Sequence, residues 1–238
     1  MTFTHYDEHR VEFGKLERLY EDNIRYYQVD GEVSYPSITS IISFVNKDKF
    51  ASWRKRVGEE EANRVSKYAT TIGTKFHLVA EYYLNNQDYQ ALDEYQVPVV
   101  QQMFKAAKPH MDKRLNKIYE QETYMYSSKL CLAGAVDLIC EVDGELAIVD
   151  FKTSKKEKPE EWLEDYFVQL SAYWAMFSER TGIVPKKLVV FLVGHNGDVQ
   201  IVERRNVIDY LTTLRDYVSK FIRYRDAWTQ WVKQSNQW

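Results

Sequence analysis

The chain has 238 residues, with 32 Lys and Arg against 35 Asp and Glu, so its formal net charge is −3. This balance argues against a passive nucleic-acid coat protein, because such proteins carry an excess of positive charge. It leaves room for a nucleic-acid enzyme, since a local basic strip or a bound divalent cation can neutralise phosphates. The two cysteines, Cys131 and Cys140, lie in predicted strands and indicate buried thiols in a reducing compartment.

The N-terminal half is predicted to be helical up to about residue 117. Residues 1–32 show no clear periodicity, but "SYPSITSIISFV" has a helix-start pattern ahead of an apolar stripe. Apolar residues at helical spacing predict a helix over residues 61–85. A further helix is predicted over residues 96–117, ended or interrupted near Pro109.

The second half predicts strands and helices in alternation. A Tyr-rich strand over residues 119–132 precedes a hairpin, and a helix follows that opens after Pro159 and stops at Gly182. The unbroken apolar run "KKLVVFLVG" predicts a strand covered on both faces, and a turn at Asn196-Gly197 leads to another strand. An amphipathic helix closes the chain. We therefore expect one α/β domain over residues 1–238, with a mixed sheet core at about 118–205 and a C-terminal helix at about 206–233.

The hairpin "AGAVDLICEVDGELAIVDFKTSKK" carries charged residues within its apolar strands. Asp143-Gly144 favours a two-residue type I′ turn, which would pair Val142 with Glu145. The same register places Asp137 directly opposite Asp150 on one face, with Lys152 farther along that face. The apolar residues Val136, Leu138, Val149 and Phe151 are then predicted to face the core together.

Two carboxylates this close repel each other by roughly 3 kcal/mol at 5 Å, if the effective dielectric constant is near 20. A divalent cation between them would offset the repulsion and could also bind a phosphate oxygen. A structural salt bridge among Asp137, Asp150 and Lys152 explains the same pattern. The hairpin residues alone leave both interpretations open.

The motif order resembles that of the PD-(D/E)XK nuclease superfamily, in its RecB-type exonuclease branch. The hairpin supplies G-x-x-D and D-x-K-T, and "YFVQLSAYW" supplies Q-x-x-x-Y on the next helix. "IGTKFHLVAEYYL" is similar to the upstream helix of that branch, with Gly73 and His77 in its G-x-x-x-H positions. "YPSITSII" resembles a segment of mitochondrial genome maintenance exonucleases and their phage relatives. The proline that usually precedes the D-x-K acid is absent, because Ile148-Val149 precede Asp150.

The resemblance implies a restriction-endonuclease-like core with extra N- and C-terminal helices, and a role for each matching residue. It implies that His77, Asp137 and Asp150 are metal ligands. It also implies that Lys152 orients or deprotonates the attacking water. A pair of carboxylates suits Mg²⁺, and an imidazole ligand would allow Mn²⁺ as well. A bound cation would lower the pKa of Lys152. Gln169 and Tyr173 match the helix element that supports the site and contacts the substrate strand.

Several further residues are candidates for supporting roles. Near the D-x-K element we expect contacts to substrate phosphates from Thr153, Lys155 and Lys156, and the basic run of residues 54–56 adds Arg54 and Arg56. Glu81 lies one helical turn after His77 and could support it from behind. Glu122 is also a candidate acid of the site, although the sequence favours a surface position for it. For the lysine run, a solvated loop is the usual alternative.

We therefore expect a Mg²⁺- or Mn²⁺-dependent deoxyribonuclease, with the resemblance favouring an exonuclease on single-stranded DNA ends or flaps. Its partners would be DNA and replication or recombination proteins, in the cytoplasm of a bacterial or phage-infected cell. The sequence shows no signal or transit peptide and no membrane-spanning run. Two alternatives are a catalytically inactive module of the same fold that binds DNA or protein, and a metal-dependent hydrolase of small phosphate esters.

Overall fold

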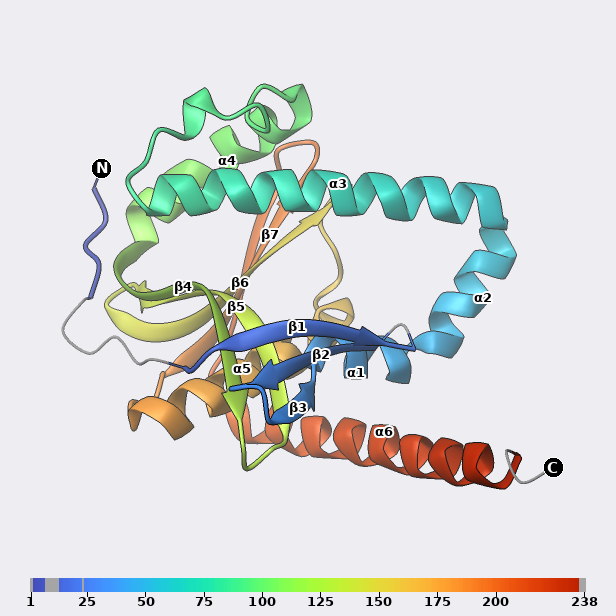
Figure 1. Ribbon diagram of the computed structural model, residues 1–238. Helices are drawn as coiled ribbons and strands as arrows, with labels where there is room; N and C mark the ends of the chain where they lie inside the picture. The colour runs from blue at the N-terminus through green and yellow to red at the C-terminus, as the bar shows by residue number, and fades with distance from the viewer. Residues whose placement is uncertain (1, 7–12, 23, 236–238) are drawn as a thin grey trace.

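The computed structural model describes residues 2–6, 13–22 and 24–235, with side chains described up to residue 226. Along the chain, short N-terminal strands are followed by a helical stretch and then by a strand-rich C-terminal half (Figure 1). The strands are β1 (Leu16–Glu21), β2 (Ile24–Val29), β3 (Val33–Pro36), β4 (Leu115–Ser127), β5 (Leu132–Val142), β6 (Glu145–Ser154), β7 (Lys187–Gly194) and β8 (Val199–Arg204). The helices are α1 (Ile38–Val45), α2 (Lys47–Val57), α3 (Glu59–Leu84), α4 (Pro98–Arg114), α5 (Glu164–Thr181) and α6 (Val207–Ser235), with 3₁₀ turns η1 (Tyr89–Ala91) and η2 (Glu160–Trp162).

The central sheet has the strand order β4-β5-β6-β7-β8. All neighbouring pairs are antiparallel except β6 and β7, which run parallel. Two parallel neighbours need a crossover connection, and α5 supplies it. The mixed sheet flanked by helices confirms the predicted fold class. Every residue of β7 is buried, as the unbroken apolar run predicts for a strand covered on both faces.

The N-terminal strands were not predicted. β1, β2 and β3 form a separate antiparallel sheet within the segment that was expected to be helical up to residue 117. The strand β1 is almost entirely exposed, so its sequence shows no alternation of apolar and polar residues. Without that alternation the sequence gives no periodic signal for a strand, and β1 is defined by its pairing with β2.

The helical stretch follows the sequence closely. α3 covers the predicted residues 61–85, and α4 covers most of the predicted 96–117. Pro109 lies inside α4 without ending it, which corrects the expected break. Because proline has no N–H, the carbonyl of Lys105 lacks its usual helical hydrogen bond from position 109. Both residues are exposed. Water can therefore satisfy that carbonyl, which lowers the cost of the proline.

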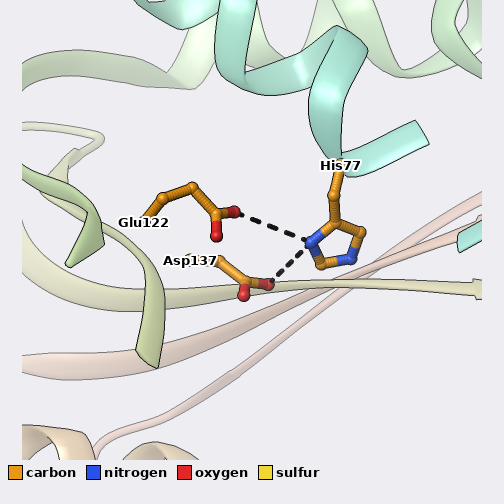
Figure 2. Close-up of side chains that lie close together, drawn as sticks. All are labelled: His77, Glu122 and Asp137. Carbon is orange, nitrogen blue, oxygen red and sulfur yellow. Dashed lines mark ion pairs between the residues drawn. The ribbon is translucent and has the colours of Figure 1, made fainter. Parts of the chain in front are cut away.

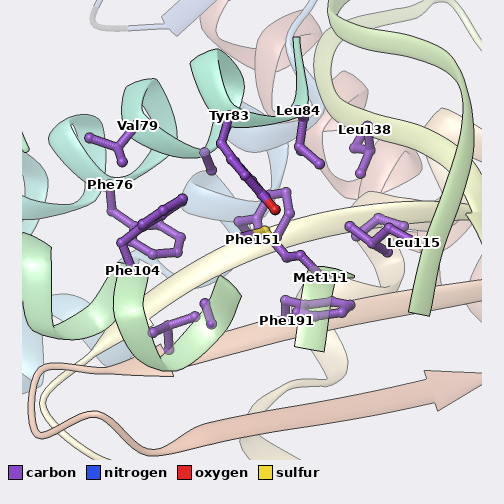
Figure 3. Packing of buried hydrophobic residues seen from close by; sticks show 14 of the residues in the cluster. Phe76, Val79, Tyr83, Leu84, Phe104, Met111, Leu115, Leu138, Phe151 and Phe191 are labelled. Carbon is purple, nitrogen blue, oxygen red and sulfur yellow. The ribbon is translucent and has the colours of Figure 1, made fainter. Parts of the chain in front are cut away.

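Two apolar clusters cover the two faces of the central sheet. One lies between the sheet and the helices α3 and α4, where Phe76, Phe104 and Phe151 pack together (Figure 3). The other lies between the sheet and the helices α1, α5 and α6. Leu138, Val149 and Phe151 belong to the first cluster as predicted, but Val136 belongs to the second. The predicted common face therefore holds only up to Leu138, because β5 separates from β6 beyond that residue.

The turn of the hairpin has the predicted geometry. Asp143 and Gly144 both have positive φ, at 52° and 80°, which is the signature of a type I′ turn. Val142 pairs with Glu145, and the same register continues to the pair of Leu138 and Val149.

The C-terminal helix α6 extends two residues past the predicted end near 233. It packs against α1 and α5 through residues such as Leu214 and Phe221. Among the residues that the structure describes, no helix combines the length and the apolar character needed to cross a membrane.

Candidate metal and catalytic site

The site lies where β5 leaves β6. Their ladder ends at Leu138 and Val149, the pair just before the two aspartates. Beyond it β6 continues beside β7 as far as Ser154, while β5 follows β4. At the separation, Oδ2 of Asp137 accepts a hydrogen bond of 2.8 Å from the backbone N–H of Phe151. The Asp137 side chain thus replaces a backbone partner and is held at the point where β5 and β6 part.

From the helical layer that covers the sheet, the side chain of His77 reaches the point where β5 and β6 separate. It lies on α3, and its Nδ1 is 3.6 Å from Asp137 Oδ2 and 3.9 Å from Glu122 Oε1 (Figure 2). Burial opposes the charged imidazolium, but Asp137 and Glu122 outweigh it and raise the pKa of His77 to about 9. The imidazolium therefore acts as counter-ion to two carboxylates among the protein's own groups.

Glu122 is exposed, as the sequence predicts, and the structure also brings it into the cluster with His77 and Asp137. Its neighbours Gln121 and Thr123 pair with Leu138 and Val136, so Glu122 lies across from Asp137. Its φ of 48° is unusual for a strand residue. The relevant signal is the register between β4 and β5, which runs unbroken from the pair of Ser127 and Leu132 to the pair of Gln121 and Leu138. The β-bulges of this ladder lie beyond Glu122, nearer α4.

The spacing of these three side chains fits one cation. One ligand atom each from His77, Glu122 and Asp137 lies within 4.8 Å of the others. Ligands about 2.1 Å from an octahedral Mg²⁺ are about 3 Å apart as neighbours and about 4 Å apart across the ion. The measured 3.6 and 3.9 Å are too long for hydrogen bonds but lie within this range. Two oxygen donors and one imidazole suit Mg²⁺ or Mn²⁺.

Asp150 and Lys152 form an ion pair beside this cluster, with the carboxylate buried and the lysine half-buried. Asp150 is fully buried, and the ammonium of Lys152 contacts its Oδ2. Burial raises the pKa of Asp150 well above its usual range, although Lys152 opposes the shift. Burial also opposes the charge on Lys152, yet Asp150 and Asp137 raise the pKa of Lys152. The protein's own groups therefore do not lower the pKa of Lys152. The predicted lowering concerns the protein with a bound cation.

The helix α5 holds the ion pair in place. Gln169 Nε2 donates to Asp150 Oδ1 at 3.2 Å and lies 3.1 Å from the hydroxyl of Tyr173. Gln169 is 7% exposed and Tyr173 only 1% exposed. Burial and the neighbouring carboxylates raise the pKa of Tyr173 well above its usual value, so it stays neutral. These two residues orient Asp150 from behind, and their burial does not support the predicted contact with a substrate strand.

Gly134 makes room for Tyr173, and we expect Gly134→Ala to lower the free energy of unfolding by about 1–3 kcal/mol. A Cβ at this position would lie 2.6 Å from Cε1 of Tyr173 and 3.2 Å from Cγ2 of Ile38. Urea denaturation followed by circular dichroism measures the loss. The matched control is Gly73→Ala, whose Cβ would meet Thr153 Oγ1 at 3.4 Å inside a helix that favours alanine. Equal stability of Gly134→Ala and the wild type would contradict the packing described.

The further candidates lie at different distances from this cluster. Thr153 Oγ1 lies 3.4 Å from the position that a Cβ on Gly73, one helical turn before His77, would take. Lys155 and Lys156 are exposed in the loop after β6. The guanidinium of Arg54 donates hydrogen bonds to Glu59 and Asn63, so the structure does not bring it to the site.

Arg56 and Glu81 complete the predicted set. Arg56 is exposed at the end of α2. Glu81 is half-buried, and burial together with the charge of Glu122 raises its pKa. The structure therefore places Glu81 near Glu122, and its role as a partner of His77 stays a prediction.

Comparison with known proteins identifies the family but gives little further detail. The family model of the PD-(D/E)XK nuclease superfamily matches residues 51–236. No curated protein matches the chain. A solved structure, "Crystal structure of SSO0001", is 15% identical, with 76% of this chain and 72% of that chain covered and a TM-score of 0.38. The family match spans most of the sequence, and the chain belongs to the PD-(D/E)XK nuclease superfamily.

Proposed function

We propose that the protein is a metal-dependent deoxyribonuclease that hydrolyses phosphodiester bonds, and that it acts as an exonuclease on single-stranded ends or flaps. The observation that carries the proposal is the position of the ion pair between Asp150 and Lys152 next to a cluster of three possible metal ligands. The preference for ends and for single strands comes from the resemblance of its motifs to RecB-type exonucleases.

His77, Glu122 and Asp137 would hold a Mg²⁺ or Mn²⁺ ion. The negative charge of Asp150, which also acts on His77, would add to the attraction for the cation. When bound, such an ion lowers the pKa of a coordinated water and polarises the phosphate. Lys152 is held by Asp150, so its ammonium has a fixed position from which it can hold or accept a proton and stabilise charge on the phosphate. Gln169 and Tyr173 keep the carboxylate of Asp150 turned toward Lys152.

Thr153, Lys155 and Lys156 follow the ion pair directly in the chain, and we propose that they contact neighbouring phosphates. The two exposed lysine side chains can contact the phosphates of a DNA strand whatever its base sequence. DNA, and proteins of replication or recombination, are the partners that this activity implies.

The wild-type protein tests this proposal directly. It should shorten 5′- or 3′-end-labelled single-stranded DNA on a denaturing gel in the presence of Mg²⁺ or Mn²⁺, and EDTA should stop the reaction. Blunt duplex DNA, a flap substrate and RNA run in parallel show which end is preferred. Absence of cleavage of every substrate, with stable DNA binding in Ca²⁺, would favour the inactive binding module instead.

A further inference from the structure

The aromatic ring of Tyr166, on α5, lies beside two lysines. The ammonium of Lys152 is 5.1 Å from the ring centroid, and that of Lys158 is 5.3 Å from it. Lys158 Nζ also donates a hydrogen bond of 3.0 Å to the Tyr166 hydroxyl. The negative face of an aromatic ring attracts an ammonium group at the distance of Lys152, whereas Lys158 is held by the hydroxyl at the edge of the ring. One side chain therefore fixes the candidate catalytic lysine and a second cation together.

The backbone of Lys158 is fixed as firmly as its side chain. Its N–H donates to Oε1 of Gln200 at 3.1 Å, and Nε2 of Gln200 donates to its carbonyl oxygen at 2.9 Å. Gln200 lies on β8, so the loop between β6 and α5 is tied to the central sheet at Lys158. Lys155 and Lys156, in the same loop, are exposed. A cation held at both its backbone and its ammonium loses little entropy when it binds an anion.

Among the residues that the structure describes, the charge of Lys158 has no local counter-ion. Lys152 is paired with Asp150, but among the described residues no carboxylate forms an ion pair with the half-buried Lys158 within 4.0 Å. Two ammonium groups around one ring repel each other, and a tyrosine ring and hydroxyl balance only part of that cost. An anion bound at this position would remove the repulsion.

We propose that Lys158 binds a backbone phosphate of the substrate strand next to the phosphate at Lys152, and that Tyr166 is the positioning residue for both lysines. This inference rests on the proposed nuclease function, because it takes the anion to be a phosphodiester of DNA. It assigns different roles to the two lysines of one ring. Lys152 acts at the bond that is cut, whereas Lys158 holds the strand beside it without taking part in bond cleavage.

Binding and turnover separate these roles. In Ca²⁺, Lys158→Ala should weaken binding of a fluorescein-labelled single-stranded oligonucleotide about tenfold. It should also reduce the salt slope, d log K/d log[salt], by about 0.7, the contribution of one contact to a single-strand phosphate. In Mg²⁺ the same variant should raise KM about tenfold and leave kcat unchanged. Lys105→Ala, which removes an exposed lysine on α4, is the matched control and should change none of these values.

Variants of Tyr166 test the positioning role. Tyr166→Phe keeps the ring but removes the hydroxyl that holds Lys158, so it should raise KM and preserve kcat. Tyr166→Leu removes the ring from both lysines, so it should lower kcat about tenfold as well as raise KM. A merely structural tyrosine would show equal losses in the two variants, together with a lower midpoint of thermal unfolding, and this pattern would overturn the positioning role.

The binding measurement keeps this inference distinct from the proposed function. If the wild type cleaves DNA but Lys158→Ala leaves both KM and the salt slope unchanged, the phosphate site is wrong while the nuclease function stands. If the wild type cleaves nothing but Lys158→Ala still reduces the salt slope in Ca²⁺, the nuclease function is wrong while the phosphate contact stands.

Discussion

Lys152→Ala should reduce the rate of DNA cleavage by about 10²–10⁴-fold, the range expected when a positioned proton-transfer or charge-stabilising group is lost. The ammonium of Lys152 is held against Asp150 and beside the ring of Tyr166, and its side chain is 21% exposed. It can therefore reach a substrate without moving far. Single-turnover cleavage of end-labelled single-stranded DNA in Mg²⁺ measures the loss directly.

The fold should survive this substitution. The pKa of Asp150 is already raised by burial, so the carboxyl group can take up a proton when its counter-ion is removed, and Gln169 still donates to it. Circular dichroism and a thermal melt check this point, and Lys152→Met provides a second variant that keeps most of the side-chain volume. Lys105→Ala on α4 is the charge-matched control. Cleavage by folded Lys152→Ala at the wild-type rate would overturn the assigned role.

Metal binding should depend on Glu122 as well as on Asp137. Replacing either carboxylate by its amide, as Asp137→Asn or Glu122→Gln, removes a charged ligand and should weaken Mn²⁺ binding by at least about 10–100-fold. The Asp137→Asn variant is not expected to unfold the hairpin, because the new amide oxygen can still accept from the N–H of Phe151. Isothermal titration with Mn²⁺ reports this affinity without any need for cleavage.

The comparison with Asp150→Asn decides between two ligand sets. The sequence predicts His77, Asp137 and Asp150, whereas the structure brings His77 together with Glu122 and Asp137. Weak Mn²⁺ binding by Glu122→Gln supports the second set, and wild-type binding by Glu122→Gln beside weak binding by Asp150→Asn supports the first. Glu60→Gln, an exposed acid on α3, is the control. Unchanged affinity in all three site variants would contradict a metal site at this position.

Local sequence predicted the hairpin well because its information is contained in neighbouring residues. The Asp143-Gly144 turn sets one register, and that register carries Asp137 and Asp150 to the end of the β5–β6 ladder. The helices α3 and α4 are similarly encoded by apolar residues at helical spacing. By contrast, the exposed strand β1 carries no alternation, so only its pairing with β2 defines it.

The sequence by itself determined the fold class, the tight turn and the order of the nuclease motifs, because each depends on residues a few positions apart. Only the tertiary structure decided that Glu122 joins His77 and Asp137, that Arg54 is occupied by Glu59, and that Tyr166 lies beside two lysines. The contact of Glu122 with His77 joins elements far apart in the chain, and its geometry follows from strand register and layer packing. The contacts of Arg54 and Tyr166 are closer in the chain, but they depend on how the side chains of folded elements meet, which local spacing does not specify.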